Sequence, residues 1–410
     1  LLSKVNVMIT KVDVQRAIAL MHSETEWQFF FEKIDSPDWL QPLTEEGIFA
    51  KPQKKKKEDG IIRIPSWPQG KYLIKVASIK SNEVAEIIKN ISRTDNPHVL
   101  DACIDAMTAM PVEVSAPLSR LAIKWIDKEY QYGLFQKIGK LIVKYFQEKK
   151  DDEALLLCKK LLYVSPDKYS ESRKSFYATN TWEFNEIIKL ITPSIMNFES
   201  KKKFIELLIR HLEKILKFRV SDVSEVYEDN SSIWRRDIDG ANLDVDDDPR
   251  DIFVSWIYIL SAELSIINKA YSKDIYLNLK EKHAPIFKRI ALFLLNKFPY
   301  DNSVVVLSLT NPDFLISDDT WHEYALLLRD QFSLLNTNSK SQVINFIASF
   351  DFKGGKDADN FNEYRRYKLL TLIKNDLNAE WKSKFEELKA KNNNKEIERP
   401  EYIYYFSGVR

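Results

Sequence analysis

Glycine is scarce in this sequence: there are nine glycines among 410 residues, where roughly 7% would be usual. Phosphate-binding loops and tight β-hairpins both depend on glycine, because it adopts backbone conformations that other residues avoid. The shortage therefore argues against a nucleotide-binding fold built on glycine-rich loops and against a sheet of many hairpins. Helices are favoured before any periodicity is considered.

Cysteines and long apolar runs are also rare. The two cysteines, Cys103 and Cys158, occupy apolar positions of helical patterns, where small buried thiols are common, so a disulfide framework is excluded. No stretch approaches ~20 uncharged apolar residues, and the first residues lack the features of a secretory signal. These absences predict a cytoplasmic protein that does not enter the membrane.

Neither sign of charge is in excess, since the chain has 61 basic and 60 acidic residues. Such a chain has no global field to attract nucleic acid or an anionic membrane, and any binding of that kind has to be local. The sequence also lacks GxxxxGK[ST], GxGxxG, GxSxG, CxxC and HExxH, which are signatures of nucleotide, hydrolase, redox and metal chemistry. We therefore expect a protein that is not an enzyme and needs no cofactor.

Apolar residues recur with helical spacing along most of the chain. In the segment 201–218, Phe204, Leu207, Leu208, Leu212 and Ile215 share one face of a helix. Similar patterns predict helices at 11–34, 68–80, 83–93, 97–110, 115–128, 131–148, 151–164, 180–197, 199–219, 249–271, 284–297, 318–335, 339–350 and 360–390.

Short connections make neighbouring helices antiparallel pairs. Between two of them, Thr94, Asp95 or Asn96 can cap the next helix and Pro97 occupies its first turn. The predicted fold is therefore all-α, an α-solenoid of antiparallel helical hairpins, with a single globular bundle as the competing arrangement. Only 60–64 and 303–309 are apolar β-branched runs, and the second is better placed to begin a helix.

Two segments interrupt the helical pattern. Residues 50–60 form a charged loop with a proline, and residues 220–250 lack a continuous apolar face. We therefore predict an N-terminal helical-repeat region at 1–219, an acidic connecting segment at 220–250 and a C-terminal helical-repeat region at 251–410.

The stretch "SNEVAEIIKNISRTDNPHVLDACIDAMTAMP" at 81–111 resembles the HEAT and armadillo class of helical repeat, although the basic residue usual in the second helix is not evident. "DSPDWLQPLTEEGIF", "SWPQGKYLIKVAS" and "DDTWHEYALLLRDQF" are similar to uncharacterised helical-repeat regions of large bacterial proteins, some of which are linked to defence against phage. The chain begins at Leu1, and we expect it to be part of a longer polypeptide. The resemblance implies a partner domain outside it.

An acidic cluster, "RRDIDGANLDVDDD" at 235–248, is the main candidate for binding a metal. Aligning Gly240 with the glycine of an EF-hand loop puts Arg235 where the first carboxylate belongs, and a cation there repels calcium. Looser binding of Ca²⁺ or Mg²⁺ remains open, as does a solvated acidic loop. The candidate ligands are Asp237, Asp239, Asp244 and Asp246.

A run of four lysines, Lys54, Lys55, Lys56 and Lys57, is the candidate for contact with nucleic acid. The aromatic residues that single-strand binding requires are nearby, as Trp67 and Tyr72. A second lysine run lies at 201–203. A solubilising surface for the lysines and a packed turn for the two rings are the alternatives.

Histidines are few, and none are paired at the spacing of metal ligands. His98 lies in the first turn of a predicted helix and His211 on an apolar face, so both are interpreted as structural. His322 has Asp318, Asp319 and Glu323 close by in sequence, but Ser317 or Asp318 also fits a helix cap there.

The leading hypothesis from the sequence is a non-enzymatic helical-repeat scaffold that holds a protein partner or another domain of its own chain. The alternative hypothesis is a nucleic-acid-binding solenoid that uses a local lysine-rich strip.

Overall fold

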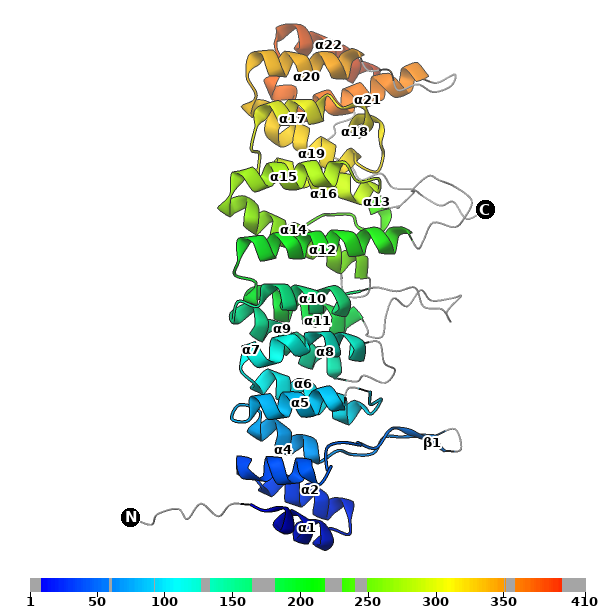
Figure 1. Ribbon diagram of the computed structural model, residues 1–410. Coiled ribbons are helices and arrows are strands. Elements are labelled where there is room, and N and C mark those ends of the chain that lie inside the picture. Colours follow the sequence, from blue (N-terminus) through cyan, green and yellow to red (C-terminus); the bar gives the residue numbers. More distant parts are fainter. Residues whose placement is uncertain are drawn as a thin grey trace. The chain divides into compact units, whose positions relative to one another are not determined.

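The computed structural model describes residues 9–58, 61–91, 93–126, 133–163, 181–217, 231–239, 249–349, 351 and 358–392. The described part of the chain is mostly α-helical, with helices packed in pairs, which confirms the predicted helical class (Figure 1). The chain divides into two compact units, unit 1 at residues 1–204 and unit 2 at residues 205–410.

Unit 1 contains helices, one pair of strands and short 3-10 turns. In chain order these are α1 (Lys11–Leu20), α2 (Glu24–Lys33), η1 (Pro37–Trp39), α3 (Leu40–Glu45), β1 (Lys56–Glu58), β2 (Ile61–Arg63), α4 (Gln69–Val76), α5 (Ser81–Asn90), α6 (Pro97–Ala109), α7 (Val112–Ser115), η2 (Ala116–Leu118), α8 (Ser119–Ile126), α9 (Leu134–Gln147), α10 (Asp151–Leu161), α11 (Thr181–Ile191), η3 (Thr192–Ser194) and the first part of α12 (Phe198–Lys217).

Polar side chains at the caps determine where several of these helices begin. Thr10 and Ser23 each form a capping box, in which the side chain accepts a backbone N–H and an acidic residue three positions later closes the first turn. Ser23 therefore separates α1 from α2, where the periodicity had predicted one helix over 11–34. Asn96 caps α6, with Pro97 in the first turn, as the sequence predicts.

The helices of unit 1 form two rows. In the first row, α2, α4, α6, α9 and α11 each contact the next, and in the second row α5 contacts α7 and α8 contacts α10. The rows touch where α4 meets α5, α5 meets α6, and α9 meets both α8 and α10. Gly70 allows the close approach of α4 to α6, because a Cβ on Gly70 would lie 2.4 Å from the Cβ of Ala102.

Unit 2 repeats this arrangement. After the rest of α12 it contains α13 (Ser231–Trp234), α14 (Pro249–Ile267), α15 (Lys269–Lys280), α16 (Pro285–Lys297), α17 (Asn302–Leu309), α18 (Pro312–Ile316), α19 (Trp321–Gln331), η4 (Phe332–Leu334), α20 (Thr337–Ser349), α21 (Ala358–Leu372), η5 (Lys374–Asp376) and α22 (Ala379–Lys391). One row runs α14, α16, α19, α21, and the other includes α17 and α20, which contact each other.

A buried ion pair joins two helices of the first row in unit 2. The Arg289 guanidinium on α16 donates to both carboxylate oxygens of Glu323 on α19, at 2.9 and 2.7 Å. It also donates to the backbone carbonyls of Arg235 (2.6 Å) and Arg236 (2.7 Å). Both side chains of the pair are almost fully buried, so this arginine fastens the segment at 231–239 to α16 and α19.

The two apolar β-branched runs have different structures. Ile61–Arg63 is a strand, paired with β1, whereas 303–309 belongs to helix α17, as predicted for each. The boundary between the compact units lies within α12, and most of the acidic segment at 220–250 lies outside the described residues. The domain limits 1–219, 220–250 and 251–410 stay a prediction.

Within the part of the chain that the structure describes, no helix combines the length and apolar character needed to cross a bilayer.

Candidate binding site at the base of a basic hairpin

Strands β1 and β2 form an antiparallel hairpin that extends away from the helices of unit 1 (Figure 1). The register places Lys56 opposite Arg63 and Lys57 opposite Ile62. We call residues 51–65, with Asp59 and Gly60 outside the description, the basic arm. Of the four predicted contact residues, Lys54, Lys56 and Lys57 are exposed and Lys55 is partly buried. The structure therefore places the lysine run along one projecting element.

Asn96 fixes the base of the basic arm to the helices. Its side-chain amide donates to the carbonyl oxygens of Gln53 and Pro65, both at 2.9 Å, so it holds the two ends of the arm together. Its side-chain oxygen accepts the backbone N–H of His98 at 2.9 Å as the cap of α6. Nearby, Asp95 accepts the backbone N–H of Lys55 at 3.3 Å. Asn96 itself is fully buried.

Asn96→Asp separates these two roles, because it keeps the capping oxygen and removes the amide donor. The carbonyls of Gln53 and Pro65 then lose a buried partner, and we expect the free energy of unfolding to fall by about 1–3 kcal/mol. Urea denaturation measures this change, and amide hydrogen exchange in β1 and β2 should become faster. Asn268→Asp is the matched control at the exposed cap of α15, where a stabilising change of a few tenths of a kcal/mol is expected. Equal effects at both positions would contradict the proposed bridging role.

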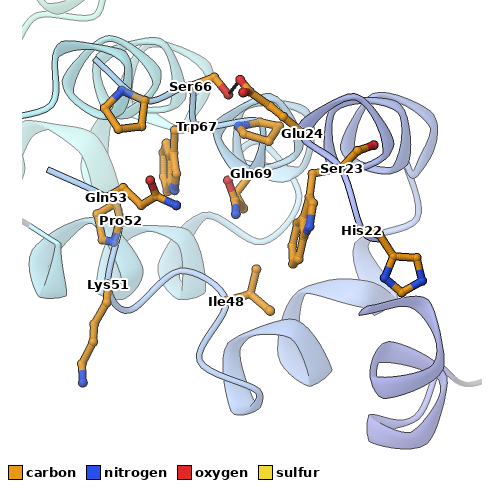
Figure 2. Close-up of a pocket in the computed structure, with 13 residues that line it drawn as sticks. His22, Ser23, Glu24, Ile48, Lys51, Pro52, Gln53, Ser66, Trp67 and Gln69 are labelled. Carbon is orange, nitrogen blue, oxygen red and sulfur yellow. Dashed lines mark hydrogen bonds between the residues drawn. The ribbon is translucent and has the colours of Figure 1, made fainter. Parts of the chain in front are cut away.

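A pocket of about 430 Å³ lies at the base of the arm (Figure 2). We call it the arm-base pocket. The start of α2, the link from α3 into the arm and the link from the arm into α4 supply its walls. Its apolar lining comes mainly from Trp27, Ile48, Pro52, Pro65, Trp67 and Pro68. Polar side chains, among them Gln53, Ser66 and Gln69, complete the lining. Pockets of this size are typical of sites for small ligands or single side groups.

Two buried polar atoms of the pocket-lining residues have no hydrogen-bond partner among the described residues: Trp67 Nε1 and Gln69 Oε1. Trp67 is only 7% exposed. Figure 2 shows its ring and the side chains of Gln53 and Gln69 turned toward the same space, while Lys51 extends outward from the rim. At another wall, the Ser66 hydroxyl donates to Glu24. The pocket wall thus contains an N–H donor and a carbonyl acceptor without a partner among the described residues.

A second pocket, of about 320 Å³, lies beside Trp67 along α4, α6 and α9. It brings together His98, Asp101, Asp105 and Lys137. Lys137 pairs with Asp105 at 2.7 Å and with Asp101 at 3.3 Å. Burial raises the pKa of Asp101 although the Lys137 charge opposes it. Burial lowers the pKa of Lys137, but the hydrogen bond to Asp105 and the two carboxylate charges outweigh it, so that pKa is raised. These groups form a charged bridge between α6 and α9.

The other aromatic and basic candidates lie elsewhere in the fold. Tyr72 is fully buried, and its hydroxyl donates to the Ser36 carbonyl at 2.9 Å, so it packs in the core and does not face a ligand. The lysine run at 201–203 lies on α12, where Lys203 forms an ion pair with Asp152 at 3.3 Å.

The acidic candidates for metal binding are only partly described. Asp244 and Asp246 lie outside the described residues. Asp239 is exposed, and Asp237 Oδ1 lies 3.9 Å from His322 Nε2. Arg235 is fully buried; its guanidinium donates to the Ile238 carbonyl at 2.7 Å and lies 3.6 Å from an Asp251 carboxylate oxygen. In the described ranges, no group of three or more His, Cys, Asp or Glu residues is placed to hold a metal ion.

We expect His322 to make the stability of unit 2 depend on pH. Burial lowers its pKa, and the Arg289 charge adds to this, while Glu323 and Asp237 act in the opposite direction. The unfolded chain takes up a proton near pH 6.5, and the folded chain does so only at lower pH. The free energy of unfolding should therefore fall as the pH drops from about 6.5 through the folded pKa.

Denaturation of the wild type and of His322→Gln at pH 7.5 and 5.5 tests this effect. The wild type should lose more stability on acidification than the variant does. If the two proteins lost the same amount, His322 would not be the group responsible.

The sequence alone did not identify the arm-base pocket, because its walls come from three segments that are separate in the chain. Trp67 follows the lysine run closely in the sequence, but Trp27 and Gln69 carry no pattern that would connect them to it. The hairpin itself had a partial signal, since Asp59 and Gly60 come directly before the β-branched run and Asp-Gly favours a two-residue hairpin turn.

Comparison with known proteins adds no relative: the chain matches no protein-family model, no curated protein and no solved structure.

Proposed function

We propose that this chain is a non-enzymatic helical-repeat scaffold in which each unit is a short α-solenoid of the HEAT-like kind, holding a protein partner or another domain of its own chain. The observation that carries this proposal is the packing of alternate helices into two rows within each unit. In repeat proteins of this kind each helical hairpin packs on its neighbours, and the stacked hairpins provide an extended surface for a partner.

Exposed apolar side chains favour a protein as the partner. Many of the most exposed large ones in the described residues lie at ends of helices or in the turns that follow them, among them Leu20, Ile79, Met196, Ile266, Ile267 and Leu334. Ile266 and Ile267 are adjacent at the end of α14 and are 74% and 70% exposed. Neighbouring exposed isoleucines have a solvation cost that a protein interface removes.

The test is affinity capture from the native host by the wild type and by Ile266→Asp/Ile267→Asp. Partners bound through this turn should be lost from the variant while its thermal unfolding stays unchanged. Ser341→Asp/Gln342→Asp is the matched control, because it adds the same charge at two exposed polar positions of α20. Recovery of the same proteins with both variants would argue against a partner site at this turn.

The basic arm favours a second candidate function, local binding of single-stranded nucleic acid. Lys54, Lys56 and Lys57 are exposed on a projecting hairpin, and aromatic residues line the pocket at its base. Filter binding of a single-stranded oligonucleotide across a salt series tests this function, since contacts to phosphate make affinity fall steeply as salt rises. Weak binding that is independent of salt would exclude the arm as a phosphate-binding element.

A further inference from the structure

We propose that the arm-base pocket receives one unpaired nucleobase of a single strand whose phosphates contact the lysines of the basic arm. This inference rests on the second candidate function, binding of single-stranded nucleic acid, and specifies where the protein holds a base. It follows from three features: two unsatisfied polar atoms of the pocket wall, the tryptophan and proline rings in that wall, and the lysines at the rim and along the arm.

The polar atoms indicate a ligand that has both an acceptor and a donor. Trp67 Nε1 donates only, and Gln69 Oε1 accepts only; both are buried, and neither has a partner among the described residues. Buried polar groups are normally satisfied, so such a pair at a pocket wall points to a missing partner. Every nucleobase carries an acceptor beside an N–H donor on its Watson–Crick edge, which is the edge that base-extruding proteins read in their pockets.

The walls suit a flat ring. Two indoles, Trp27 and Trp67, and three prolines line the space, and stacking of bases on aromatic side chains is the main sequence-tolerant contribution in single-strand binding. Because all bases share the acceptor and donor arrangement, the pocket should discriminate poorly among them. The presence of a base, not its identity, is what this site detects.

The lysines at the rim and along the arm favour an anionic ligand. Lys51 lines the pocket and extends outward, and Lys54 and Lys56 continue from it along the arm. Lys56 lies on β1 and Lys54 just before it, and both are exposed, so the arm presents further cations beyond the pocket. An uncharged proline-rich peptide also fits a wall of tryptophan and proline, but it would leave these cations unused.

The experiment compares two fluorescein-labelled 12-mers at 100 mM salt: oligouridylate and an abasic strand with the same phosphates. The wild type should bind oligouridylate about 10-fold more tightly, the amount expected for one stacked base. Trp67→Phe removes the N–H donor and keeps a ring, and Gln69→Leu removes the acceptor. Each should reduce the preference to less than about 3-fold with the salt dependence unchanged. Trp39→Phe is the control, since Trp39 is a partly buried tryptophan of unit 1 outside the pocket lining.

The outcomes distinguish binding of a base in the pocket from binding of phosphates by the arm. Equal affinity for the two strands with a steep salt dependence would overturn the pocket proposal and leave binding by the arm intact. No measurable binding of either strand would overturn both. A fluorescein-labelled proline-rich peptide is the third probe: if it bound the wild type, lost affinity in Trp67→Phe and displaced no oligonucleotide, the pocket would be a peptide site and the nucleobase proposal would be wrong.

Discussion

Glu323→Ala is expected to lower the free energy of unfolding by about 3–5 kcal/mol, because it leaves the buried Arg289 guanidinium without its counter-ion. Arg289 is 1% exposed and Glu323 is fully buried. The same guanidinium donates hydrogen bonds to the carbonyls of Arg235 and Arg236. We therefore also expect the segment at 231–239 to exchange its amide hydrogens faster in the variant than in the wild type. Urea denaturation followed by tryptophan fluorescence measures the loss of stability.

Two variants control for this effect. Glu363→Ala breaks the exposed ion pair of Glu363 with Lys391, at 2.6 Å, and should cost less than about 1 kcal/mol. Arg289→Met/Glu323→Leu removes both buried charges and should be less harmful than Glu323→Ala alone. A loss below about 1 kcal/mol in Glu323→Ala would mean that the pair does not hold α16 to α19.

The helical class could be predicted from the sequence because it depends on local patterns. Apolar residues three and four positions apart determine which face of each segment is buried, and Val84, Ile87 and Ile88 on α5 are buried as their spacing predicts. Errors arose where a cap interrupts a continuous pattern. The helix predicted at 249–271 runs past Asn268, whose side chain caps α15, because periodicity alone does not register a cap.

The polar interior could not be predicted in the same way. Arg289 and Glu323 are 34 residues apart in the sequence and bond to each other in the core. A charged residue inside an apolar helix has the same sequence pattern whether it faces solvent or a buried partner, since the partner comes from another segment. The bond between Asn96 and Gln53, 43 residues apart, shows the same limit for the candidate site: the cap was predicted, but the bridge to the basic arm was not.

The four-lysine variant of the basic arm is expected to have the largest effect on function. Lys54→Gln, Lys55→Gln, Lys56→Gln and Lys57→Gln together remove four cations from the projecting hairpin. If each contacts one phosphate of a single strand, the slope of log affinity against log salt falls by about 3, and affinity at 100 mM salt falls roughly 100-fold or more. Fluorescence anisotropy with oligouridylate across a salt series measures both quantities.

The control for this variant has the same charge change on the helices of unit 1. Lys33, Lys124, Lys140 and Lys159 are all exposed and lie outside the arm, so their replacement by glutamine alters net charge without altering the hairpin. Long-range attraction depends on net charge and would weaken equally in both variants, whereas direct phosphate contact requires the arm lysines themselves. Equal losses in the two variants would therefore show that the arm is not the element that contacts phosphate.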